Sequence, residues 1–524
     1  MKTFPAELLS ISAVELSRRL HSREITSVEL LKTTLDRIDE VNPKIRAIVA
    51  LRKDRDNLLQ EAQDADFDLD SAAASTDENK QAGWLRGIPL AIKDLEKAKG
   101  LPTTSGGCPL FGVQTEQGED EGSYRFGDWK FENEMEDEPF VRRLRDAGAI
   151  IIGKTNAPEI GMGCHSYNTI HGTTLNPYNL SVSAGGSSGG AAAALASNML
   201  VLSDGSDMMG SLRNPAGWNN LYSIRSTAGW MKESIDGEAD DSTESDIELP
   251  YPTSTVGPMA RCPEDLAMFL ETILPEEQRT DFDASAVIDK SLEDLNLLVK
   301  RSKIGWLADW GGSLPFEDGV LSHCKRRLDL FDSKGGASIE CLSDAPFPND
   351  DLWDSWMVIR SHKIFNSLHE RIGCDVDEVI PTLKACHVKP EAIWECEQGE
   401  CLTRQQLELA LEKAHDWSAV AETLFQSYDF LALPSSQVYP FDASIDWPKS
   451  IAGKKMDTYH RWMNVMVPVT LLGAPCVTIP AGIGSTSGLP MGIQIFAKKG
   501  KDVQLLQLAR WYCRNFEMNI DLAV

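Results

Sequence analysis

A stretch of small residues at positions 183–215 constrains this chain more strongly than any other part of its sequence. It opens with Ser187 and Ser188 between two glycine pairs, and an alanine-rich run follows at positions 191–196. Glycine permits tight turns and close approach of other groups, whereas alanine favours helix. The pattern therefore predicts a tight turn followed by a closely packed helix.

A second tight segment at positions 205–211 ends in Ser211, which lies 24 residues after Ser187. A turn, a helix and a strand fit into that length and could fold back to bring the two hydroxyl groups together. A serine hydroxyl is a weak nucleophile until a base accepts its proton, and glycines let backbone N–H groups approach a reacting oxygen. The two segments together predict a serine-dependent hydrolytic site.

The candidate base lies upstream, in an apolar segment at positions 87–94 that contains Lys93. A buried strand would carry this lysine into the interior, where burial lowers its pKa and a neutral amine can accept a proton. A lone lysine is more often a solvated charge, and a Gly-Ser run is more often a linker. Only their combination, in this order with Ser211, favours catalysis.

These motifs resemble those of the amidase signature family, whose catalytic triad is Ser–cis-Ser–Lys. The family pattern G-G-S-S-G-G matches residues 185–190, G-[ST]-D-x-x-G-S-[IL]-R-x-P matches residues 205–215, and G-[IV]-P-x-x-[IV]-K-D matches residues 87–94. The resemblance also covers the N-terminal helices and the segments 153–159, 257–261 and 473–494. Most of the chain is thus matched in the family's order.

The resemblance implies one α/β domain over residues 1–524, although the length alone would favour two to four domains. Its core would be a large, twisted, mixed β-sheet covered by helices on both faces. We expect N-terminal helices (1–66), a catalytic core (83–262) with an insertion (114–138), a variable substrate-selecting region (275–470) and a C-terminal return to the core (471–524).

The resemblance also implies the role of each site residue. Ser211 would be the nucleophile, and Ser187, preceded by a cis peptide bond, would relay its proton to Lys93. The further residues of the expected site are the oxyanion-binding backbone groups of Met208, Met209 and Gly210 (with that of Ser211) and the supporting side chains of Ser188, Asp207 and Arg213. No cofactor is implied, and the nine histidines are scattered without the spacing of metal ligands, so no metal site is expected.

The activity implied is hydrolysis of a linear carboxylic amide to an acid and ammonia or an amine, through an acyl-enzyme on Ser211. An alternative is the glutaminase subunit of a tRNA-dependent amidotransferase, which would need partner subunits and a carboxylate that binds glutamine. No such carboxylate is evident at positions 463–470. A catalytically impaired relative is a further alternative, because Met209, Ser223 and Ser226 depart from the family pattern.

Charge and cysteine usage limit the partners and the location. The net charge of −28, from 79 acidic and 51 basic residues, argues against nucleic acid and anionic membrane surfaces. The expected partner is a small amide, with a homodimer also allowed. The 11 cysteines show no paired C-x-x-C spacing, and no secretory leader or long apolar run is evident, so we expect reduced thiols and a cytoplasmic location.

Other patterns predict local structure. Apolar spacing predicts a helix at residues 28–41, ended by Asn42 and Pro43, and a further helix at 52–66, followed by an acidic loop at 68–80. The insertion at 114–138 is predicted to be a polar surface flap with an aromatic knot; an active-site lid is the alternative. Residues 148–155 match the letters of a P-loop, but their isoleucines favour a buried strand.

Overall fold

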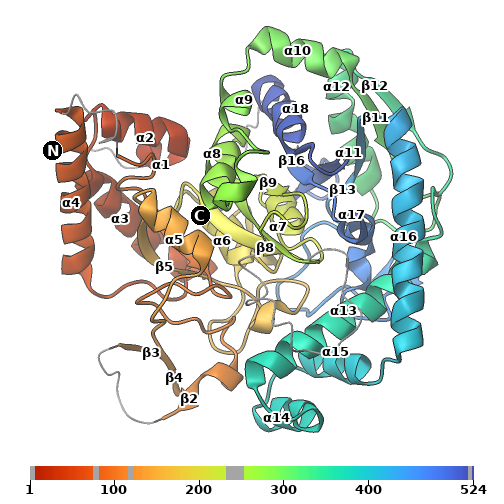
Figure 1. Ribbon diagram of the computed structural model, residues 1–524, viewed down its shortest axis with the longest axis horizontal. Coiled ribbons are helices and arrows are strands. Elements are labelled where there is room, and N and C mark those ends of the chain that lie inside the picture. Colours follow the sequence, from red (N-terminus) through yellow and green to blue (C-terminus); the bar gives the residue numbers. More distant parts are fainter. Residues whose placement is uncertain (1–5, 75–81, 116–121, 232–252, 517–521) are drawn as a thin grey trace.

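The computed structural model describes residues 6–74, 82–115, 122–231, 253–516 and 522–524, and a central eight-stranded sheet organises them (Figure 1). The strands, in spatial order, are β12 (Ser338–Cys341), β11 (Lys303–Trp306), β13 (Phe430–Pro434), β17 (Pro490–Phe496), β16 (Cys476–Ile483), β9 (Tyr222–Arg225), β10 (Thr255–Ala260) and β8 (Ser203–Asp207). The first three pair in parallel and all later pairs are antiparallel. The predicted mixed sheet is therefore confirmed.

Helices cover both faces of this sheet. Adjacent residues of a strand point to opposite faces of the sheet. On β9, Tyr222 hydrogen-bonds Cys513 of the helix 502–515. The next residue, Ser223, donates from Oγ to the carbonyl of Leu212, just before the helix 213–218, at 3.4 Å. The helices against the sheet are α6 (Gly189–Ala196) and α7 (Arg213–Trp218) on one face, and α8 (Pro263–Ile273), α11 (Val320–Leu328) and α18 (Asp502–Asn515) on the other. The prediction of helices on both faces is thus confirmed.

The remaining helices surround these layers, apart from α17, whose six residues are all buried (Figure 1). They are α1 (Ala6–Ser10), α2 (Ala13–His21), α3 (Ser27–Ile45), α4 (Arg55–Ala73), α5 (Pro139–Asp146), α9 (Ser285–Ile288), α10 (Leu292–Arg301), α12 (Leu330–Ser333), α13 (Asn349–Ile372), α14 (Val379–Ala385), α15 (Pro390–Glu400), α16 (Arg404–Ser427) and α17 (Val467–Leu472). The two short hairpins are β6 (Leu175–Asn176) with β7 (Asn179–Ser183), and β14 (Ser450–Ile451) with β15 (Lys454–Lys455).

Two predicted boundaries near the N-terminus were wrong. Helix α3 continues through Pro43 to Ile45, because Pro43 lies on the exposed side of the last turn while Ile45 is buried. Helix α4 extends to Ala73 rather than ending at residue 66, since Leu69 packs into the core with 1% of its surface exposed. The predicted acidic loop therefore begins later, and residues 75–80 of it lie outside the described part of the chain.

A separate parallel pair, β1 (Pro89–Lys93) and β5 (Ile150–Thr155), lies beside the edge of the large sheet. All residues of both strands are buried, which confirms the predicted strand at the P-loop-like sequence. Lys154 Nζ is used inside the fold, donating to the carbonyl of Glu96 and to Thr103 Oγ1. Strand β1 ends at Lys93, as the sequence predicted.

The described residues of the insertion lie at the periphery of the molecule (Figure 1). Strands β2 (Val113–Gln114), β4 (Trp129–Glu132) and β3 (Ser123–Phe126) form a small antiparallel sheet. Tyr124 and Phe131 are 7% and 2% exposed, and the Phe126 ring meets His171 edge-on at 4.6 Å between centroids. These aromatic rings pack against one another and against His171, and thereby attach the insertion to the body of the protein.

Candidate active site

Lys93 lies wholly inside the protein, with 0% of its surface exposed. Its Nζ donates hydrogen bonds to Ser187 Oγ at 2.7 Å and to Ser206 Oγ at 2.9 Å. Burial lowers the pKa of Lys93 to about 8, although nearby carboxylates, Glu96 first among them, oppose this shift. A lysine with such a pKa is partly neutral near pH 7 and can act as a base.

Asp204 of β8 holds Lys93 in place. The backbone N–H of Lys93 donates to both carboxylate oxygens of Asp204, at 3.1 and 3.2 Å. Burial raises the pKa of Asp204 to about 6, and the bond from Lys93 opposes this. The carboxylate therefore joins β1 to the edge strand of the large sheet through a side chain. The sequence assigned no role to Asp204 or to Ser206, although Asp204 directly precedes the second motif and Ser206 lies inside it.

Ser187 lies in the predicted tight turn before α6, and the Gly186–Ser187 peptide bond is cis, as the resemblance implied. Glycine is required at 186 because a Cβ there would lie 2.7 Å from the Cα of His165. The carbonyl of Ser187 accepts from Ser166 Oγ at 3.0 Å, and that hydroxyl accepts from the N–H of Gly189 at 2.9 Å. These contacts fix the direction of the Ser187 side chain toward Lys93.

Ser211 lies two residues before the start of α7 and lines the same cavity as Ser187. Its carbonyl accepts from the N–H of Ser188 at 3.3 Å, and Ser188 Oγ accepts from the N–H of Ser206 at 3.4 Å. The two serine loops are therefore held side by side. The structure brings Ser187 and Ser211 to one cavity, with Lys93 bonded to Ser187 from inside the fold.

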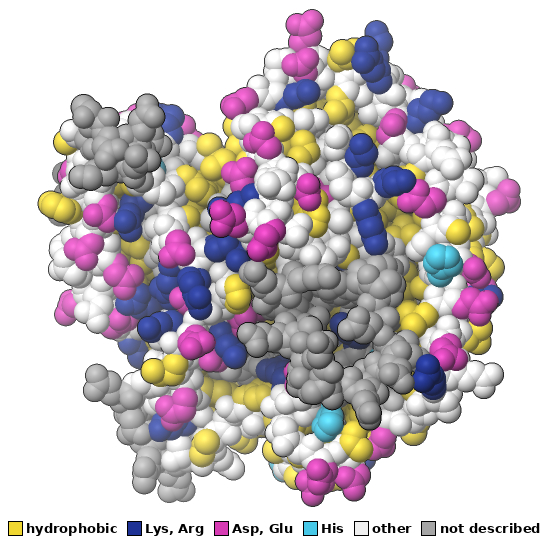
Figure 2. Space-filling view, viewed as in Figure 1, with side chains coloured by type: hydrophobic (Ala, Val, Ile, Leu, Met, Phe, Trp, Pro, Cys, Tyr) yellow, Lys and Arg dark blue, Asp and Glu magenta, His cyan; other side chains and the backbone are white. Residues whose placement is uncertain are grey.

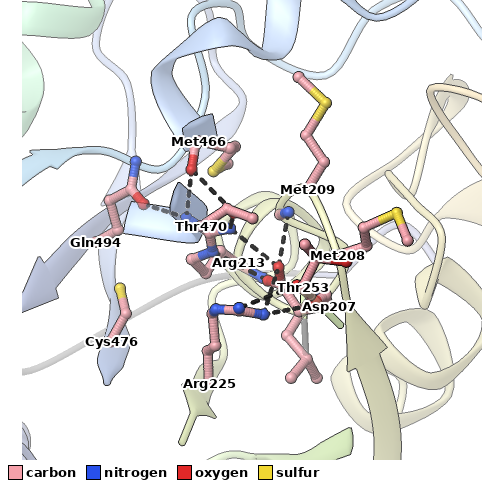
Figure 3. A network of polar contacts seen from close by, with 12 residues as sticks. Asp207, Met208, Met209, Arg213, Arg225, Thr253, Met466, Thr470, Cys476 and Gln494 are labelled. Carbon is pink, nitrogen blue, oxygen red and sulfur yellow. Dashed lines mark hydrogen bonds and ion pairs between the residues drawn. The ribbon is translucent and has the colours of Figure 1, made fainter. Parts of the chain in front are cut away.

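Asp207 organises the loop before Ser211 (Figure 3). Its carboxylate accepts from the N–H groups of Gly210 at 2.8 Å and Leu212 at 3.2 Å, and from Arg213 Nε and a terminal nitrogen at 3.0 and 2.9 Å. Burial opposes ionisation, but Arg213 and then Arg225 hold the pKa of Asp207 well below its usual value. The predicted support from Asp207 and Arg213 is thus a buried ion pair that shapes the loop.

One expected oxyanion donor is already used. The Gly210 N–H donates to the carboxylate of Asp207, so we no longer count Gly210 among the N–H groups expected to bind the oxyanion. Among the described residues, the N–H groups of Met208, Met209 and Ser211 have no hydrogen-bond partner. Gly210 itself has φ +91°, and a Cβ there would lie 2.6 Å from Met466 Cγ, so glycine is required for the loop to turn.

Arg213 joins this loop to the C-terminal segment, a contact that the sequence did not reveal (Figure 3). Its terminal nitrogens donate to Gln494 Oε1 at 2.8 Å, to Thr470 Oγ1 at 2.9 Å and to the carbonyl of Met466 at 3.1 Å. Gln494 is the last residue of the segment 473–494 that resembles the family, and this resemblance was the only feature of the sequence that could have pointed to Gln494 as part of the site. The motif at 205–215 is therefore held by residues more than 250 positions away.

The cavity in front of the serines has a volume of about 200 Å³. Ser187, Ser206 and Ser211 form one wall together with the side chains of Met208 and Met209. Much of the opposite lining comes from one face of α13 and from the segment before α17: Arg360, Lys363, Ile364, Ser367, Leu368, Arg371, Tyr459, His460 and Met463.

A buried ion pair supports that lining. Arg360 Nε donates to Glu395 Oε1 at 2.7 Å, and another Arg360 nitrogen donates to the Tyr459 hydroxyl at 2.8 Å. The Tyr459 hydroxyl in turn donates to Glu395 at 2.7 Å, and a third Arg360 nitrogen contacts Met208 Sδ at 3.4 Å. These three side chains join α13, α15 and the cavity wall to the loop before Ser211.

The described part of the chain contains neither a metal-binding cluster nor a membrane-spanning helix. No group of three or more His, Cys, Asp or Glu side chains is arranged to hold a metal ion in the described ranges. No helix in these ranges is long and apolar enough to cross a membrane. On the face shown in Figure 2, acidic and basic side chains lie interspersed.

Comparison with known proteins gives one family. The family model named Amidase matches residues 124–506. The A-type subunit of glutamyl-tRNA(Gln) amidotransferase from Corynebacterium glutamicum (strain R) is 27% identical over 532 residues, covering 96% of each chain. The acylamidase of Rhodococcus erythropolis is 27% identical over 511 residues, covering 97% of this chain and 95% of the relative.

Solved structures share the fold. A bacterial aryl acylamidase of the amidase signature enzymes superposes with a TM-score of 0.79 at 22% identity, covering 96% of both chains. The A-type subunit of glutamyl-tRNA(Gln) amidotransferase from Thermotoga maritima gives a TM-score of 0.65 at 20% identity, covering 96% of this chain and 94% of that one. At these identities the likeness establishes the fold.

Proposed function

This chain belongs to the amidase signature family, and from that premise we propose that it hydrolyses a linear carboxylic amide to an acid and ammonia or an amine. The observation that carries the proposal is the 2.7 Å hydrogen bond from buried Lys93 to Ser187, beside the cavity that Ser211 lines. A buried lysine can accept a proton through a neighbouring hydroxyl, and a serine nucleophile needs such a base.

In the first half of the reaction, Ser211 Oγ attacks the amide carbonyl carbon. Its proton passes to Ser187 Oγ while the Ser187 proton passes to the neutral Lys93 Nζ. The carbonyl oxygen becomes an oxyanion, which the N–H groups of Met208, Met209 and Ser211 stabilise. The C–N bond then breaks, and the leaving nitrogen takes a proton back through Ser187 from Lys93, so that an ester on Ser211 remains.

In the second half, water replaces the amine. The Lys93–Ser187 pair removes a proton from the water as its oxygen adds to the ester carbonyl carbon. The bond to Ser211 Oγ breaks, the serine regains its proton, and the acid leaves. Ser188, Asp207 and Arg213 act in both halves by holding the two serine loops in their relative positions.

We also propose a role for each segment of the chain. We assign substrate selection to residues 275–470, because α13 and the segment before α17 contribute much of the cavity lining. The catalytic groups come from residues 83–262, while residues 1–66 and 471–524 complete a single domain. We also retain the small amide as the partner and the cytoplasm as the location; a homodimer is tested by the mass of the purified protein in solution.

A second candidate is the glutaminase subunit of an amidotransferase, because relatives named as amidotransferase subunits are 27% identical to this chain. The segment 463–470 opposes this assignment: Met463 lines the cavity, and no acid occurs in these eight residues. Purified alone, this protein should release little ammonia from glutamine. An impaired relative is less well supported, because only Met209 of the three departing residues lines the cavity. Ser223 and Ser226 are buried and hydrogen-bonded away from it.

A screen of the purified protein against aliphatic, aromatic and N-aryl amides tests the proposal, with ammonia or amine release as the readout. We expect hydrolysis of at least one class, abolished in Ser211→Ala. Glutamine, alone and with a tRNA-charging system, belongs in the same screen. Release from glutamine alone among the amides would favour the amidotransferase assignment, and no release from any amide would favour the impaired relative.

A further inference from the structure

The oxyanion loop, residues 207–211, is held at its ends by backbone contacts but not in its middle. The carboxylate of Asp207 accepts a hydrogen bond from the N–H of Gly210 at 2.8 Å. Between these two residues, the backbone of Met208 and of Met209 makes no hydrogen bond within the described part of the chain. Two of the three N–H groups proposed to stabilise the oxyanion therefore lie where the backbone contacts do not fix the loop.

The side chains of Met208 and Met209 hold the middle of the loop instead. In Figure 3 both side chains extend away from the carboxylate of Asp207. Trp356 Nε1 donates a hydrogen bond to Met209 Sδ at 3.0 Å, and a terminal nitrogen of Arg360 contacts Met208 Sδ at 3.4 Å. Trp356 and Arg360 both belong to α13 and lie about one helical turn apart. One helix thus holds two consecutive residues of the loop by their sulfur atoms.

The contact between Trp356 and Met209 is an unusual use of a buried indole. Trp356 is 0% exposed and Met209 is 3% exposed, so the contact is shielded from water. A thioether sulfur is only a weak hydrogen-bond acceptor. Trp511, another buried indole, donates instead to an oxygen atom, Oδ1 of Asn296, at 2.8 Å. The Trp356 N–H therefore gains less stability from its acceptor, whereas its contact attaches the oxyanion loop to α13.

Trp356 lies behind the cavity wall. Other residues of α13, such as Ile364, Ser367 and Leu368, line the cavity in front of the serines, but Trp356 is not among the described lining residues. Met209, to which Trp356 donates, does line it. Any effect of Trp356 on the reaction must therefore pass through the loop. Oxyanion donors act mainly in the transition state, and a small displacement of such groups costs much of their effect.

We propose that Trp356 is a positioning residue, which acts through Met209 Sδ to hold the N–H groups of Met208 and Met209 where the oxyanion forms. The helix that lines the substrate cavity would then also set the geometry of the oxyanion site. This inference rests on the amide hydrolysis proposed above and adds a residue that the proposed reaction does not use.

A pair of single variants and their combination test the inference, with the fastest amide of the screen as substrate. Trp356→Phe keeps an aromatic ring but removes the N–H donor, and Met209→Leu removes the sulfur at similar volume. Each should lower kcat by about tenfold and leave KM within about twofold, because the lost contact matters in the transition state. The double variant should be no slower than the slower single variant, since both changes remove the same contact.

Trp511→Phe is the matched control, because it also removes a buried indole donor, on α18 and outside the cavity lining. It should keep the wild-type kcat. The rate of Ser211 labelling by a fluorophosphonate is a second readout that needs no known substrate, since charge also grows on the phosphoryl oxygen. Labelling should slow in Trp356→Phe and Met209→Leu but not in Trp511→Phe.

Several outcomes would overturn the inference. They are a change in KM without a change in kcat, an equal loss of kcat in Trp511→Phe, and losses that multiply in the double variant. An unchanged kcat and labelling rate in Met209→Leu would do so even if Trp356→Phe failed to fold. Absence of both turnover and labelling in the wild-type protein would overturn the proposed function instead.

Discussion

The pH dependence of activity follows directly from the environment of Lys93. The amine must be neutral to accept the proton relayed from Ser211, and burial lowers its pKa to about 8. Protonation below that pH removes the base, so kcat/KM should rise with pH and level off above the pKa. An exposed lysine, with its ordinary pKa of 10.5, would keep the rate rising well beyond pH 9.

The size of the effect can be worked out. A base with a pKa of about 8 is neutral in roughly one molecule in eleven at pH 7, in about half at pH 8 and in about ten in eleven at pH 9. The kcat/KM for a neutral amide should therefore increase about tenfold between pH 7 and pH 9. Initial rates at low substrate concentration in a buffer of constant ionic strength measure this ratio.

Substitution of Glu96 should shift the pKa of Lys93 in a direction that the structure predicts. Its carboxylate is the leading charge that raises the pKa of Lys93, and burial raises the pKa of Glu96 itself to about 7. Glu96→Gln removes that charge, so the pKa of Lys93 should fall and the rising limb should move to lower pH. The rate at pH 7 should increase relative to the plateau.

The matched control is Glu132→Gln, because the Glu132 side chain on β4 is 71% exposed. This substitution should leave the pH at which kcat/KM rises unchanged. A profile that is flat from pH 6 to pH 9, or a limb that moves to higher pH in Glu96→Gln, would refute the reasoning. Either result would mean that Lys93 is not the base.

Three further outcomes are expected. Lys93→Ala should lower kcat by about 10³-fold or more, and Lys93→Arg nearly as much because arginine stays protonated; near-normal turnover of the arginine variant would exclude the base role. Because Lys93 is the proposed base, dialysis against EDTA should leave the rate unchanged, and a loss restored by added metal would contradict this. Phe131→Ala should destabilise the fold by about 3 kcal/mol in chemical denaturation, and half-buried Trp129→Ala by less; equal costs would mean that the insertion is not anchored through Phe131.

The parts of the fold that follow from local sequence could be predicted. Short runs of apolar or small residues indicated three elements, and each occurs as expected: the strand that ends at Lys93, the alanine helix after Ser187 and the strand at residues 150–155. The effect of Pro43 could not be predicted in this way, because whether a proline ends a helix depends on which side of the last turn is exposed.

The candidate site was predictable only where its residues share a motif. Ser187, Ser211, Asp207 and Arg213 lie in two short segments, but the residues that hold or face them are distant in sequence. Nothing near Arg213 indicates a contact with Gln494, and nothing near Met208 indicates one with Arg360. The hydrogen bond from the Gly210 N–H to Asp207 depends on how the loop folds, so the sequence of the motif could not predict it.

The identity of the nucleophile is the central claim of this account, and a covalent probe tests it most directly. A fluorophosphonate should form a stable adduct with the activated serine, and digestion followed by mass spectrometry should place the label on the peptide that contains Ser211. Ser211→Ala should lose the label. Label that persists in Ser211→Ala, or that maps to the peptide containing Ser187, would contradict the assignment of Ser211 as nucleophile and Ser187 as proton relay.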